Sequence, residues 1–130
     1  MSNFLKAFNV HFSELLDDLV KVHPQNLDLK TAKITQMALS KMNPSKLIKV
    51  WKNHIIKYAD ELNEGNISAF IDKDYTSELN NYDSSQSGEI NSIIGSLREP
   101  IRNMGPENQE KALKYIQNLN KLCKLYFNIN

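Results

Sequence analysis

The residues that first suggest chemistry lie between positions 72 and 83, where side-chain oxygens recur at the spacing of a twelve-residue calcium loop. Positions 1, 3, 5, 7, 9 and 12 of that loop are Asp72, Asp74, Thr76, Glu78, Asn80 and Asp83. The sixth position is Ser77 rather than the glycine that makes the sharp turn, the twelfth lacks the bidentate glutamate, and Lys73 adds a positive charge. We therefore expect no metal here. We interpret Asp72 and Asp74 as a solvent-exposed, negatively charged face that is available to a partner.

The other side chains with catalytic potential are scattered along the chain. His11 and Glu14 lie three residues apart, but no second histidine completes a helical zinc site, and His23 and His54 are isolated. Two carboxylates at i and i+2 point apart on a helix, so the acidic pair is not a catalytic dyad. The single cysteine, Cys123, falls on an apolar helix face and is expected to be a buried, inert thiol. The sequence thus predicts no catalytic residue, no cofactor and no enzyme.

Hydrophobic residues at intervals of three and four predict that helices position these side chains. No segment shows the alternation of a β-strand, and no repeat or long linker divides the chain. The predicted helices cover residues 2–22, 28–42, 44–62, 67–72 and 87–104, with a last one from residue 106. We predict an all-α fold, a compact bundle of five or six helices, in a single domain over residues 1–130.

Capping residues set several of these boundaries. Asn26 or Asp28 is a candidate N-cap for the second helix. Asn43 as cap with Pro44 at the first helical position predicts the start of the third helix, and Gly65 suits its end.

Apolar stripes name the predicted core. The third helix has the clearest stripe, with Trp51 at its centre, and Trp51 is therefore expected in the core. The residues predicted to face inward in the second helix are Ala32, Ile34, Met37, Ala38 and Met42. Residues 76–88 are rich in turn formers and predict a loop, and Pro100 is expected to kink the following helix or end it early.

Length and composition place the chain among globular proteins. Its 130 residues fit one domain, with 41% apolar and 24% charged residues. No apolar run approaches the roughly 20 residues that cross a bilayer. The first residues lack the pattern of a signal peptide, and a single cysteine suits a reducing compartment. We expect an intracellular protein that is not secreted and has no membrane span.

Charge is segregated although the net charge is only +1. Residues 41–57 contain five lysines and no acid, whereas residues 60–89 contain eight acids and one lysine. The simplest reading is a solvated lysine face that packs near the acidic segment. The sharper reading is an interaction surface for a protein partner or a second copy. The residues predicted to bind the partner are Lys46, Lys49, Lys52, Lys57, Asp72 and Asp74.

A nucleic-acid partner is the alternative for this lysine face. Residues 43–58 are able to serve as a groove-binding helix, but Trp51 and Ile55 within them belong to the buried stripe. The near-neutral charge and the presence of only two arginines also argue against phosphate and base recognition.

Three strings together resemble a known group of proteins. They are DLKTAKITQMALSKMNPSKLIKVWKNHI, FIDKDYTSEL and LREPIRNMGPENQEKALKYIQNLNKL. The resemblance spans about Phe12 to Tyr126 and is to a family of small, largely uncharacterised helical proteins of nucleocytoplasmic large DNA viruses. It carries no catalytic motif. It implies a setting in the virion or in the cytoplasm of an infected cell, and a protein that works by contact.

The leading hypothesis is therefore a non-enzymatic structural or protein-interaction protein, such as a minor virion or capsid-associated component. The alternative is a nucleic-acid-associated protein that binds the phosphate backbone through the lysine face of the third helix. Salt-sensitive binding to non-specific DNA or RNA distinguishes the second hypothesis from the first.

Overall fold

A computed structural model describes residues 3–71 and 84–129, and within these ranges every regular element is a helix. The α-helices are α1 (Asn3–Val22), α2 (Leu27–Met42), α3 (Lys46–His54), α4 (Ala59–Asn63), α5 (Ser68–Ile71), α7 (Ser84–Arg102) and α8 (Pro106–Phe127). A short 3-10 helix, η1 (Ile56–Tyr58), joins α3 to α4. The predicted all-α bundle in one compact domain is confirmed, and the described ranges hold more helices than expected because the predicted third helix is divided.

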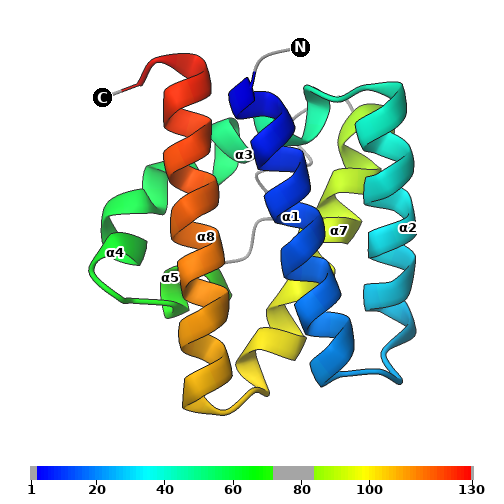
Figure 1. The fold of residues 1–130 in the computed structure, drawn as a ribbon, viewed down its shortest axis with the longest axis vertical. Helices are drawn as coiled ribbons and strands as arrows, with labels where there is room; N and C mark the ends of the chain where they lie inside the picture. Colours follow the sequence, from blue (N-terminus) through cyan, green and yellow to red (C-terminus); the bar gives the residue numbers. More distant parts are fainter. Residues whose placement is uncertain (1–2, 72–83, 130) are drawn as a thin grey trace.

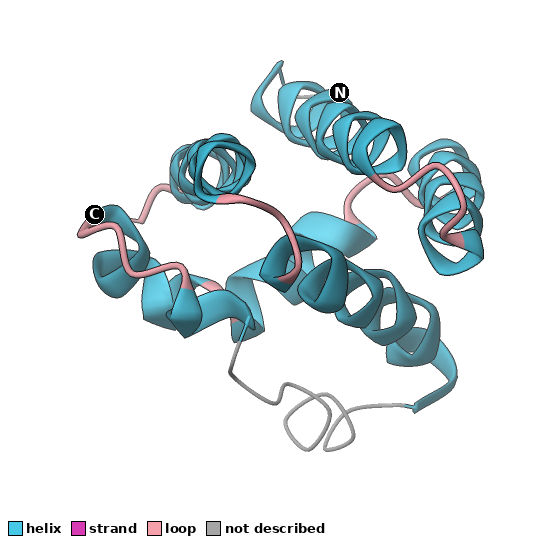
Figure 2. Ribbon diagram, turned by 90° about the horizontal axis from the view of Figure 1, so that it is seen from below, coloured by secondary structure: helices cyan, strands magenta, loops and turns pink. Residues whose placement is uncertain are grey.

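The long helices form two layers (Figures 1 and 2). The first and last helices, α1 and α8, lie side by side and antiparallel, and α2 flanks α1 at one edge of the molecule. Behind them lie α7 and the shorter helices α3 to α5. No helix in the described part of the chain is both long and apolar enough to cross a membrane.

Trp51 lies at the centre of the core, as its stripe predicts. Its side chain is fully buried, and three phenylalanine rings surround it. The ring centroids of Phe8 and Phe12 in α1 lie 5.8 and 5.9 Å away, both edge-on, and that of Phe70 in α5 lies 6.1 Å away. This aromatic cluster fastens α3 and α5 to α1, and edge-on pairs of this kind add to the burial of apolar area.

Two buried amides tie the first three helices together. The Asn9 side chain in α1 donates to the Pro44 carbonyl at 2.8 Å, and Gln36 in α2 donates to the Asn9 carbonyl at 3.2 Å. Because buried polar groups are costly when unpaired, these bonds fix the register of α1 against α2 and against the turn before α3.

The third helix begins later than predicted. The Asn43 backbone N–H donates to the Leu39 carbonyl at 2.8 Å, so Asn43 ends α2 rather than starting α3. Pro44 lies in the intervening turn, and Ser45 is the N-cap of α3. Asn26 caps α2 as one of the two expected candidates, because its side chain accepts from the Leu29 N–H at 3.1 Å.

The predicted stripe of residues 44–62 is kept although the helix is broken at residue 55. Ile55 and Leu62 are buried on the same side as Trp51, while the backbone tightens into η1 between them. Gly65 ends α4 with φ +92°, a conformation that glycine adopts without strain. The Asn66 N–H bonds to the Glu61 carbonyl at 3.0 Å, which satisfies a free carbonyl of the last turn.

The helix α7 starts earlier than predicted and continues through its proline. It begins at Ser84, so residues 84–86, predicted as loop, are helical; serine is favoured at helix starts. Pro100 does not end the helix, which runs to Arg102. The His23 Nε2 donates to the Pro100 carbonyl at 3.0 Å, which links this end of α7 to the turn after α1.

Candidate interaction surface

The four lysines predicted to bind a partner belong to two elements. Lys46, Lys49 and Lys52 lie in α3, and Lys57 lies in η1. All are exposed except Lys46, which is half-buried. Asp72 and Asp74, together with the calcium-like loop, lie outside the described residues.

Two of these lysines lie over aromatic rings. The Lys52 Nζ is 4.8 Å from the ring centroid of Phe127 in α8, and the Lys57 Nζ is 5.4 Å from that of Tyr58. A cation over an aromatic face gains about 0.5–1 kcal/mol at an exposed site. Part of the basic face is therefore used for packing, and Lys52 helps to join α3 to α8.

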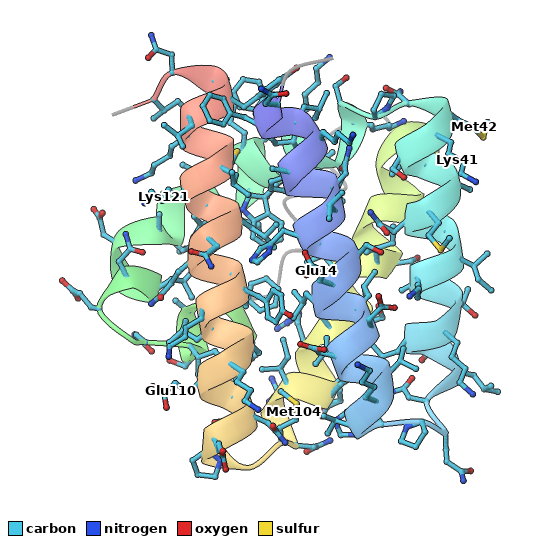
Figure 3. All side chains as sticks on the ribbon, in the orientation of Figure 1. Glu14, Lys41, Met42, Met104, Glu110 and Lys121 are labelled. Atoms are coloured by element: carbon cyan, nitrogen blue, oxygen red, sulfur yellow. The ribbon has the colours of Figure 1, made fainter. Side chains whose placement is uncertain are left out.

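The outer face of α2 carries the largest correction to the sequence prediction. Ile34, Met37, Ala38 and Met42 were predicted to face inward, yet Ile34 is 70% and Met42 84% exposed, and the other two are also exposed. Only Ala32 of that set is buried. Figure 3 shows Met42 at the outer edge of the molecule, pointing away from the bundle.

The true core side of α2 contains a polar residue, which is why the prediction was wrong. Leu29, Ala32 and Gln36 are the buried residues, and Gln36 is only 2% exposed. A glutamine in a sequence predicts a solvent-facing position. Here the buried hydrogen bond from Gln36 to the Asn9 carbonyl makes this glutamine a core residue. With residue 36 placed inside, the helical period turns Leu27 and Ile34 outward.

We call Leu27, Ile34, Met37, Ala38 and Met42 the α2 outer face. The helical period places these residues on one side of the helix. Exposed Lys30 and Lys41 lie within this face, between Ile34 and Met37 around the helix axis. The α2 outer face is therefore an exposed apolar surface with two lysines among its residues.

The seam between α1 and α8 holds a small cluster of titratable groups. Two adjoining hollows of about 210 and 430 Å³ share Asp18, Lys111 and Tyr115 in their walls. The Tyr115 hydroxyl donates to Asp18 Oδ2 at 2.7 Å, and its ring centroid lies 4.7 Å from that of His11. Figure 3 shows Glu14 at the same seam, and its carboxylate lies 3.8 Å from His11 Nδ1. Sequence reasoning paired His11 with Glu14 but missed the contribution of α8.

This cluster favours a structural role for Tyr115 over an acid–base one. The hydrogen bond to Asp18, then burial, then the negative charges of Asp18 and Glu14 raise the pKa of Tyr115 to about 12. The phenol therefore stays protonated near neutral pH and acts as a fixed donor between α8 and α1.

Cys123 is buried in α8, as predicted, where its thiol lies 3.7 Å from the Ile48 carbonyl. Burial raises its pKa to about 12, although the charge of Lys52 acts in the opposite direction. A thiol held protonated in this way is a poor nucleophile.

The described residues contain no group of three histidine, cysteine, aspartate or glutamate side chains placed to hold a metal ion. Comparisons with protein-family models, with curated proteins and with solved structures found no match to this chain.

Proposed function

We propose that this protein acts by binding another protein rather than by catalysis, and that the α2 outer face makes the contact. The observation that carries the proposal is the exposure of Leu27, Ile34 and Met42 along one face of a helix at the edge of the bundle. Exposed apolar stripes of this kind commonly mark interaction sites.

The lysines within this face favour, as its partner, an amphipathic helix that carries acidic residues next to its apolar ones. Such a helix buries its apolar side on Ile34 and places carboxylates next to Lys30 and Lys41. A second copy of α2 is a poorer occupant. Packed antiparallel with the two-fold axis between Thr35 and Gln36, it brings Lys30 of one copy opposite Lys41 of the other.

The setting implied by the family resemblance makes a virion or capsid-associated partner the specific form of this proposal. Within that setting the protein is a minor structural or adaptor component. Mass spectrometry of purified particles tests this part: the protein is expected among the packaged components, and its absence would exclude the virion role.

The contact surface is tested with two matched double variants. Ile34→Ser with Met42→Ser alters the α2 outer face, whereas Val10→Ser with Leu125→Ser alters exposed apolar residues on α1 and α8. Crosslinked partners from infected cells are expected to be retained by the second variant and lost by the first. Equal recovery with both variants would show that α2 is not the contact.

Size measurement by light scattering across a salt series separates the two kinds of occupant. The purified protein is expected to stay monomeric at low salt, since the lysines oppose pairing of two copies. If the protein instead forms a dimer, and the Ile34→Ser and Met42→Ser changes abolish it, the partner on the α2 outer face is a second copy of the chain and not a different protein.

Binding of nucleic acid through Lys46, Lys49, Lys52 and Lys57 is the second proposal, and the exposure of Lys49 and Lys52 supports it. A gel-shift assay with non-specific DNA and RNA tests it. Binding must be present at about 50 mM salt and weaken steeply as salt rises. No shift at low salt rejects this alternative.

A further inference from the structure

Asn120 is a buried residue whose side-chain amide forms a hydrogen bond through only one of its two polar atoms. It lies in α8 with 2% of its surface exposed, and its Oδ1 accepts a hydrogen bond from the Trp51 indole at 2.7 Å. The indole nitrogen can only donate, so the amide oxygen must face Trp51 and the NH2 group must face away from it. This pair links α3 to α8 across the core.

The NH2 group of Asn120 has no acceptor among the residues that the structure describes. Buried polar atoms are almost always paired, so this donor is available to a partner from outside the described residues. The amide thus keeps a donor ready while its other end is fixed by Trp51.

Asn120 forms part of the wall of a hollow between α8 and α4. The hollow has a volume of about 310 Å³, and its wall consists of Asn63, Gln117, Asn118, Asn120, Lys121, Lys124 and Leu125. The Gln117 side chain donates to the Leu62 carbonyl at 2.8 Å, which holds α8 against α4 at this point. In Figure 3, Lys121 extends from α8 toward the side of the molecule where α4 lies.

The wall of this hollow is positively charged and rich in donors. It contains two lysines and no carboxylate, and neither Lys121 nor Lys124 forms an ion pair with a described residue. Lysine ammonium and amide NH2 groups donate hydrogen bonds, and charge-assisted bonds to an anion are the strongest they make. Because the Asn120 NH2 group is buried, an oxygen atom reaches it only when a side chain of the wall moves aside.

We propose that this hollow binds a small oxyanion, a carboxylate or a phosphate group, between the Asn120 amide and the ammonium groups of Lys121 and Lys124. One oxygen accepts from Asn120 Nδ2, and the remaining charge lies between the two lysines. The site is on the side of the molecule away from the α2 outer face and does not depend on the function proposed above.

Trp51 and Asn120 together provide the measurement. Nitrogen-15 NMR of the full chain follows the Trp51 indole and the Asn120 NH2 signals during titration with inorganic phosphate and, separately, with acetate. Saturable movement of both signals at about 10 mM anion is expected. The anion that binds more tightly identifies a phosphate or a carboxylate as the group recognised, and either result supports the site.

Variants with equal charge change separate the site from general screening. Lys121→Gln with Lys124→Gln is expected to weaken binding about tenfold or more. Lys111→Gln with Lys114→Gln removes two charges from the α1 side of the same helix and is expected to leave binding unchanged. Asn120→Asp keeps the acceptor for Trp51 but removes the donor, and it is expected to abolish binding.

Two results would overturn the proposal. If the signals do not move, the Asn120 amide is satisfied by water only. If both double lysine variants weaken the change in the NMR signals equally, the anion acts by screening charge and not by binding at a site. Because Lys121 is exposed and Lys124 only half-buried, the lysine variants give this answer even if Asn120→Asp does not fold.

Discussion

Tyr115 shows how one residue joins the two ends of the chain. Its hydroxyl bonds to Asp18 across the seam between α8 and α1, and neither residue suggests this pairing from its local sequence. A hydrogen bond between residues 97 positions apart depends on how helices pack, which single-sequence patterns do not encode.

The stabilisation that this bond provides is expected to be lost at alkaline pH. Folding raises the pKa of Tyr115 from 10.0 to about 12, so the bond stabilises the fold fully below pH 10 and is lost as pH rises through 12. Urea unfolding at pH 7 and at pH 11 should show that Tyr115→Phe is destabilising at pH 7 and less so at pH 11. Tyr126→Phe, which leaves Asp18 untouched, is the control. An unchanged difference at both pH values would contradict the assigned role.

Cys123 is expected to be unreactive toward thiol reagents in the folded protein. Burial raises its pKa to about 12, so almost no thiolate is present at pH 8, and the packed core excludes the reagent. A colorimetric thiol assay should detect no reaction under native conditions and one thiol per chain in denaturant. Rapid native reaction would mean that α8 opens away from α3.

At the level of elements, the sequence predicted most helices but misplaced some of their boundaries for identifiable reasons. Periodicity located α1, α2 and α8 because their apolar residues repeat over several turns. The start of α3 was misplaced because Asn43 suits either helix end, and only its bond to the Leu39 carbonyl decides between them.

The exposed residues of α2 were predicted less well than the fold. The lysines of the third helix were identified from charge alone, and Lys49 and Lys52 are indeed exposed. The α2 outer face was missed because α2 carries two apolar stripes, and the choice between them rests on Gln36, whose partner lies in α1.

The orientation of α2 gives a direct stability test. Leu29 is fully buried and Leu27 is 73% exposed, although they are two positions apart. Leu29→Ala is expected to cost about 2–5 kcal/mol because it leaves a cavity. Leu27→Ala is expected to change stability by about 0.5 kcal/mol or less. Urea unfolding followed by circular dichroism measures both, and similar losses would mean that the helix faces the other way.

For the molecule as a whole, the two candidate surfaces lie at opposite edges. The α2 outer face flanks α1, while the hollow between α8 and α4 lies beyond α8 (Figure 1). A protein partner on α2 would therefore leave the proposed oxyanion site open, and we expect that both can be occupied together. Since the bundle core lies between them, variants at one surface are expected to leave the other unaffected.

The antiparallel contact of the first and last helices also has a kinetic consequence. Its Tyr115–Asp18 bond joins residues 97 positions apart, whereas the bonds of Asn9 to Pro44 and of Gln36 to Asn9 join residues 35 and 27 positions apart. Contacts between residues far apart in sequence lose more entropy when the loop between them closes, and they tend to form late in folding. We expect Tyr115→Phe to speed unfolding with little change in the folding rate, and Asn9→Ala to slow folding, in stopped-flow measurements. The order in which the helices dock would then run from the N-terminal end, with α8 closing the bundle last.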